Sequence, residues 1–218
     1  MDRLFLPGWG APGSLYIPGL APGWTALEPP SFAATRGSLE LYRSWVLSEL
    51  QGREHPSCLA GHSMGGALAV LAAAAAPEKV SRLILFSPAG LPLGKPMAVS
   101  LARFAQQAAT GRYASTEAFA AVARAAAAPR SALRLARSLR ALDLAQEMRA
   151  VRASGVPVEV VGCATDTLVT PANSRSVAHL LGGSYRELPC AGGHMWMLDA
   201  WPLFAGILAR TEPVAAGA

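Results

Sequence analysis

The chain of 218 residues is predicted to form an α/β domain on a mainly parallel sheet of about six strands. Three observations predict this class. Short apolar runs alternate with helical patterns, 52% of the residues are hydrophobic while 15% are charged, and a glycine-rich motif stands where one apolar run passes into a helical pattern. Such a composition buries enough apolar surface to offset the entropy lost on folding, which excludes disorder as the main state.

The first 91 residues alternate strands with helices, as expected for a parallel sheet with crossover connections. Strands are expected at residues 3–6, 24–27, 57–60 and 80–86. The helix expected at 38–50 has one apolar side. The helix expected at 64–76 is apolar on nearly all sides, which indicates a buried position, and Pro77 stops it.

Residues 92–152 differ in character, because they contain long Ala, Leu and Arg patterns without a strand signal. We expect them to form a helical cap inserted into a core made of residues 1–91 and 153–218. The core resumes with strands near 157–161 and 184–188, and with helices near 171–181 and 196–210.

Charge and cysteine content exclude several function classes. The net charge is +5, yet residues 92–155 alone carry ten basic and three acidic side chains, so the basicity belongs to the insertion. This confinement argues against nucleic-acid binding. Three widely spaced cysteines show no metal-binding spacing and are expected to be reduced thiols. No membrane-span-length or secretory apolar segment is present in the sequence, which predicts a cytoplasmic protein.

The motif Gly61-His62-Ser63-Met64-Gly65-Gly66 follows an expected strand and opens an expected helix. In this context a G-x-S-x-G sequence forms a sharp turn that pushes the serine side chain out of the sheet. The helix N-terminus adds backbone N–H groups and a positive dipole end, which suit a developing oxyanion. Ser63 is therefore predicted to be a nucleophile.

A serine hydroxyl needs a base at neutral pH, and four histidines are available. His62 should point away from the Ser63 hydroxyl, His55 lies in a polar loop, and His179 falls within a helix. His194 follows the last strand in a flexible Gly-Gly-His loop and is predicted to be the base.

An acid should orient this base. Asp166 lies just past the carboxyl end of the expected strand at 157–161 and precedes the helix that starts at Pro171, whereas Glu159 lies inside that strand. Asp143 and Glu147 belong to the helical insertion, so Asp166 is the predicted acid.

The order Ser63, Asp166, His194, together with the G-H-S-M-G-G motif, resembles the α/β-hydrolase superfamily. The resemblance implies an oxyanion hole formed by the N–H of Met64 and by an N–H of the loop after the first core strand. That loop usually reads His-Gly-x and here reads Pro7-Gly8-Trp9, so Trp9 is the implied second donor. Because the expected strand at 3–6 already leads into this loop, the superfamily's usual N-terminal antiparallel hairpin is expected to be absent. The resemblance implies no metal or other cofactor.

Within the superfamily, Leu-Pro-Gly-Trp-Gly and a basic helical cap look most like the pimeloyl-acyl-carrier-protein methyl ester esterases of biotin synthesis. This resemblance implies a serine carboxylesterase whose cap meets the acidic carrier protein. The alternatives are a general short-chain esterase or lipase, a thioesterase, lactonase or perhydrolase on the same residues, a menaquinone-pathway lyase, and a non-enzymatic binding module.

One face of the cap carries arginines at helical spacing, opposite a leucine stripe. These candidates for contact with an acidic carrier are Arg130, Arg134, Arg137 and Arg140. An ordinary solvated helix face is the favoured explanation of these arginines, since the chain contains seventeen Arg and two Lys, and contact with a carrier is the alternative. Candidates for lining an acyl pocket include Phe104, Phe119 and Met195, each of which is also a plausible core residue.

Overall fold

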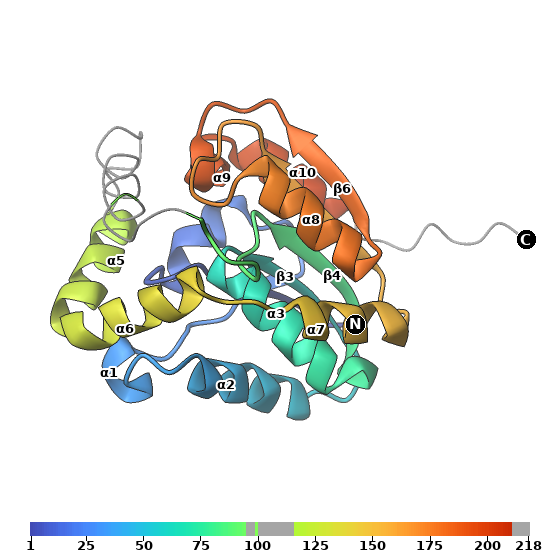
Figure 1. Ribbon diagram of the computed structural model, residues 1–218, viewed down its shortest axis with the longest axis horizontal. Helices are drawn as coiled ribbons and strands as arrows, with labels where there is room; N and C mark the ends of the chain where they lie inside the picture. Colours follow the sequence, from blue (N-terminus) through green and yellow to red (C-terminus); the bar gives the residue numbers. More distant parts are fainter. Residues whose placement is uncertain (95–98, 100–115, 211–218) are drawn as a thin grey trace, which may run out of the picture.

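The computed structural model describes residues 1–94, 99 and 116–210, and it contains one sheet of six parallel strands (Figure 1). The strands are ordered β2-β1-β3-β4-β5-β6 and every neighbouring pair is parallel. They span β1 Arg3–Leu6, β2 Trp24–Ala26, β3 Ser57–His62, β4 Val80–Phe86, β5 Val158–Cys163 and β6 Ser184–Leu188. The prediction of a mainly parallel sheet of about six strands is confirmed.

Helices cover both faces of this sheet. One face packs against α2 (Leu39–Gln51), α3 (Met64–Ala75), α7 (Ala145–Ser154) and α8 (Pro171–Leu181). The opposite face packs against the 3-10 helix η1 (Gly13–Gly19), α9 (Trp196–Asp199) and α10 (Trp201–Ala209). The remaining elements are α1 (Phe32–Thr35), α5 (Thr116–Ala127), α6 (Pro129–Arg140), and the short 3-10 helices η2 (Pro77–Lys79) and η3 (Gly193–Met195).

The strand order reverses at β1, which lies between β2 on one side and β3 on the other. Crossover connections leaving β1 and β3 therefore diverge to opposite sides, and in open α/β sheets ligands generally bind at the carboxyl ends of two such strands. The loop Pro7-Gly8-Trp9 and Ser63 both follow these strand ends. The topology thus positions the candidate functional residues.

Helix α7 begins inside the expected insertion 92–152 and ends at Ser154, just beyond it. Met148 and Val151 are buried, and the helix packs against α3 and α8. The helix expected at 196–210 divides at Ala200, whose backbone is not helical (φ −135°, ψ 47°). Pro202 lacks the N–H that would continue α9, and it lies instead in the first turn of α10, where that N–H is not needed.

Helices α5 and α6 lie together at one end of the molecule, at the left of Figure 1. Arg124 of α5 ties them to the core, since its guanidinium pairs with Glu28 and donates to the Pro29 carbonyl oxygen at 2.7 Å. None of the helices within the described residues has the length and apolar character needed to span a membrane.

Candidate active site

Ser63 occupies a strained turn between β3 and α3. Its backbone angles are φ 54° and ψ −113°, a region that residues other than glycine rarely adopt. The turn is held on both sides, because the Ser63 N–H donates to the Phe86 carbonyl at 3.0 Å and the Ala89 N–H donates to the Ser63 carbonyl at 3.0 Å. This is the strand–turn–helix geometry that the G-x-S-x-G motif predicts.

Two glycines make the turn possible through close backbone contact. A Cβ on Gly61 would lie 2.4 Å from the Gly65 carbonyl carbon, and a Cβ on Gly65 would lie 2.0 Å from the Leu6 carbonyl oxygen. The N-terminus of α3 therefore sits directly against the end of β1. Consequently the buried Met64 and the loop that carries Trp9 occupy the same corner of the fold.

Asp166 and His194 form a buried pair. His194 Nδ1 lies 2.8 Å from Asp166 Oδ2, and the His194 and Asp166 side chains are 2% and 0% exposed. Because a carboxylate oxygen can only accept, His194 Nδ1 carries the proton, and the lone pair of Nε2 remains available to take one. Among the described residues no hydrogen bond joins Nε2 to Ser63 Oγ, a contact that often tightens only when substrate binds.

The loops carrying this pair are fixed by further hydrogen bonds. Asp166 Oδ1 accepts the N–H groups of Leu168 at 2.9 Å and Val169 at 3.0 Å, so only Oδ2 faces His194. Thr165 bridges the two loops, since its hydroxyl accepts from the Gly193 N–H at 3.1 Å and donates to the Cys190 carbonyl at 2.8 Å.

His62 also reaches this region, although the sequence suggests only that it turns away from the Ser63 hydroxyl. Both of its ring nitrogens are bonded, Nδ1 to the Tyr16 hydroxyl at 2.8 Å and Nε2 to the His194 carbonyl oxygen at 3.0 Å. Burial, followed by the nearby His194, holds the pKa of His62 well below its ordinary value of 6.5. Nothing in the sequence singles out Tyr16, which lies in η1 and is fully buried.

The other acids and histidines lie elsewhere. Glu159 is bound within the sheet by Arg82 at 3.2 Å and Arg186 at 2.6 Å. His55 and His179 are exposed on the surface. The described residues contain no group of three or more His, Cys, Asp or Glu side chains that could hold a metal ion.

Trp9 connects the loop after β1 to the cap. Its indole Nε1–H donates to the Ala132 carbonyl of α6 at 3.2 Å, and its ring packs on Phe32 with centroids 5.2 Å apart. Of the candidate pocket residues, Met195 is partly buried in η3. Phe104 and the side chain of Phe119 lie outside the described part of the structure.

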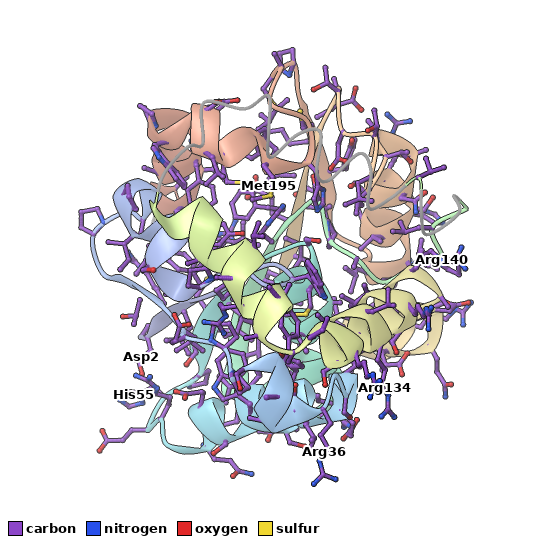
Figure 2. The ribbon with its side chains drawn as sticks, turned by 90° about the vertical axis from the view of Figure 1, so that its left-hand side faces the viewer. Asp2, Arg36, His55, Arg134, Arg140 and Met195 are labelled. Atoms are coloured by element: carbon purple, nitrogen blue, oxygen red, sulfur yellow. The ribbon has the colours of Figure 1, made fainter. Side chains whose placement is uncertain are left out.

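The candidate arginines line the outer side of α6, whose inner side buries Ala132, Leu135 and Leu139. Figure 2 shows Arg134 and Arg140 reaching outward, whereas Met195 lies toward the middle of the same view. Arg130, Arg134 and Arg137 are exposed and, within the described residues, form no ion pair, while Arg140 is partly buried.

A sequence profile described as the alpha/beta hydrolase family matches residues 4–207. No curated protein has a detectably similar sequence. The enol-lactonase from Burkholderia xenovorans LB400 is a similar solved structure, 20% identical with a TM-score of 0.71, covering 96% of this chain and 90% of that one.

Two other solved structures share the fold. A lipase-esterase related protein from Clostridium acetobutylicum ATCC 824 is 14% identical with a TM-score of 0.74, covering 96% of this chain and 93% of that one. The thioesterase domain from the curacin biosynthetic pathway is 19% identical with a TM-score of 0.67, covering 95% of this chain and 90% of that one. At these identities the likeness concerns the fold alone.

Proposed function

The chain belongs to the alpha/beta hydrolase family, and we propose that it is a serine carboxylesterase. The observation that carries this proposal is the buried Asp166–His194 pair, held against His62, the residue that immediately precedes the strained Ser63. This arrangement provides a nucleophile at the carboxyl end of β3, a base with a free nitrogen, and an acid that orients the base.

In the proposed reaction Ser63 Oγ attacks the ester carbonyl carbon while His194 Nε2 accepts the hydroxyl proton. The N–H groups of Met64 and Trp9 stabilise the oxyanion of the tetrahedral intermediate. His194 then returns the proton to the departing alcohol, leaving an acyl group on Ser63. Water, deprotonated by the same nitrogen, releases the acid and restores the serine.

Covalent labelling tests this assignment independently of the natural substrate. A fluorophosphonate should modify one residue per chain, Ser63, and Ser63→Ala should abolish both labelling and hydrolysis of a short-chain p-nitrophenyl ester. Labelling that persists in Ser63→Ala would show that the nucleophile is a different residue. A wild-type protein that neither labels nor cleaves esters would favour a binding role for the fold.

We further propose that the substrate is an acyl methyl ester attached to acyl carrier protein, such as the pimeloyl ester of biotin synthesis. The exposed arginines of α6 support this, because Arg130, Arg134 and Arg137 have no acidic partner among the described residues. Arginine forks suit the carboxylates and phosphate of such a carrier, and a clustered positive field raises the association rate about tenfold or more at low salt.

The test compares a methyl ester presented free and on the carrier. The wild type should cleave the carrier-bound form with the higher kcat/KM, and reversal of Arg134 and Arg137 to Glu should remove that advantage. Reversal of Arg175 and Arg210, which lie on α8 and after α10, is the control with the same change in net charge. Equal cleavage of both forms would leave a general carboxylesterase, and preference for a thioester or a lactone would indicate those activities instead.

A further inference from the structure

A buried chain of hydrogen bonds joins three loops of the candidate site. The Gly8 N–H lies 3.4 Å from the Tyr16 hydroxyl oxygen, that hydroxyl lies 2.8 Å from His62 Nδ1, and His62 Nε2 lies 3.0 Å from the His194 carbonyl oxygen. This series of hydrogen bonds therefore begins beside Trp9, passes beside Ser63 and ends at His194, the residue proposed as the base.

We infer that Tyr16 and His62 are positioning residues, which hold the oxyanion loop and the loop of His194 at a fixed distance on either side of Ser63. This inference rests on the proposed function, since it assigns a role to residues that do not touch the reacting atoms. It assigns a role to Tyr16, which no motif in the sequence identifies, and to His62, which the G-x-S-x-G motif contains only at a variable position.

The direction of each hydrogen bond follows from chemistry. A carbonyl oxygen only accepts, so His62 Nε2 must carry its ring proton and Nδ1 must be an acceptor. Tyr16 therefore donates its hydroxyl proton to Nδ1, which leaves its oxygen free to accept from the Gly8 N–H. Every member has a partner, and reversing any one bond would leave a buried group unsatisfied.

Close packing around Tyr16 and His62 holds these hydrogen bonds in place. Tyr16 is fully buried, and its ring lies against Phe5 with centroids 4.6 Å apart. A Cβ on Gly8 would lie 3.0 Å from His62 Nδ1 and 3.4 Å from the Tyr16 hydroxyl, so the loop rests directly on the two side chains. A shift of Tyr16 or His62 would thus displace the backbone next to Trp9.

The ring of His62 also adjoins that of His194, with centroids 4.7 Å apart. His194 gains a positive charge when it accepts the serine proton, and a second charge so close would oppose that step. Burial keeps the pKa of His62 well below 6.5, so His62 stays neutral and can hold the His194 backbone throughout.

The test uses Tyr16→Phe, with Tyr42→Phe as the matched control. Tyr42 lies on α2 and is likewise buried, but its hydroxyl donates to the Pro30 carbonyl oxygen at 3.1 Å and not to any of the three loops. Tyr16→Phe should lower kcat about tenfold or more with KM unchanged, and should slow fluorophosphonate labelling of Ser63 by the same factor. Tyr42→Phe should alter neither, even where both variants lose the same thermal stability.

Two further measurements complete the test. In protein labelled with [15N]histidine, the His62 signals should show the Nε2–H tautomer, with Tyr16→Phe moving only the Nδ1 resonance substantially. His62→Gln, whose amide can still donate to the His194 carbonyl, should retain more activity than His62→Ala. Equal kcat in Tyr16→Phe, Tyr42→Phe and wild type would overturn the inference, whereas a wild type whose Ser63 never labels would overturn the proposed function.

Discussion

Asp166 Oδ2 lies 2.8 Å from His194 Nδ1, and the second oxygen of the same carboxylate is occupied by two backbone N–H groups. The carboxylate can therefore neither rotate nor exchange its oxygens without losing a hydrogen bond. This contact fixes the ring proton of His194 on Nδ1.

Asp166→Asn should abolish most activity while leaving the fold intact. The amide oxygen would keep the contacts to Leu168 and Val169, so its NH2 group would face His194 Nδ1. His194 would then have to carry its proton on Nε2, where it cannot accept one from Ser63. The expected loss is about 10³–10⁴ in kcat for an aryl ester.

The control is Asp143→Asn. Asp143 is exposed and, among the residues that the structure describes, accepts only the Ala145 N–H, at 3.0 Å, so its replacement should leave the rate unchanged. Activity within a few-fold of wild type in Asp166→Asn would mean that another group orients His194.

Gly65→Ala should destabilise the protein through a backbone clash. The added Cβ would lie 2.0 Å from the Leu6 carbonyl oxygen. This oxygen belongs to the buried strand β1, whose displacement would disturb the packing of the core. We expect a loss of about 1–3 kcal/mol or more in the free energy of unfolding, together with slower labelling of Ser63. Gly206→Ala in α10 is the control, because nothing lies within 4 Å of the added methyl and alanine favours helix. Equal melting temperatures for the two variants would contradict the close approach of α3 to β1.

The sequence predicts this turn well because the constraint is local. Gly61, Ser63 and Gly65 are close in the chain, and the strand before them and the helix after them follow from apolar pattern alone. Asp166 and His194 are predicted from their places after two strands, and the structure brings the two side chains together.

Features that depend on long-range packing are not predicted. Tyr16 and His62 are 46 residues apart, and their hydrogen bond forms only because η1 packs against β1 through the contact of Tyr16 with Phe5. Helix α7 resembles the rest of the Ala- and Arg-rich insertion in composition, and only the structure shows that it packs against α3 and α8.

The protein should become less stable below about pH 6.5, in part because of His62. Burial lowers the pKa of His62 in the fold, whereas in the unfolded chain it returns to about 6.5. Below that pH the unfolded state binds one proton more than the folded state, so the free energy of unfolding falls by up to about 1.4 kcal/mol per pH unit. Urea unfolding at several pH values between 5 and 7.5 measures the slope.

The free energy of unfolding should depend less steeply on pH in His62→Gln than in the wild type, even if the variant is less stable at pH 7.5. His179→Gln removes an exposed histidine on α8 and serves as the reference. An unchanged slope in His62→Gln would mean that His62 becomes protonated without unfolding, at the expense of its bond to the Tyr16 hydroxyl.

The thiol of Cys190 should react slowly although its side chain is only half-buried. Burial, followed by the hydrogen bond to Cys163, whose sulfur lies 2.9 Å away, raises the pKa of Cys190 to about 12. Burial raises the pKa of Cys58 to about 11. At pH 8 both groups are almost wholly protonated, and iodoacetamide requires the thiolate.

Mass spectrometry should show that iodoacetamide alkylates both Cys190 and Cys58 about a hundredfold more slowly in the folded protein than in guanidinium. Cys163→Ala should accelerate Cys190 and leave Cys58 unchanged, because it removes the bond that stabilises the Cys190 thiol; rapid alkylation of Cys190 in the wild type would contradict the pairing of the two sulfurs.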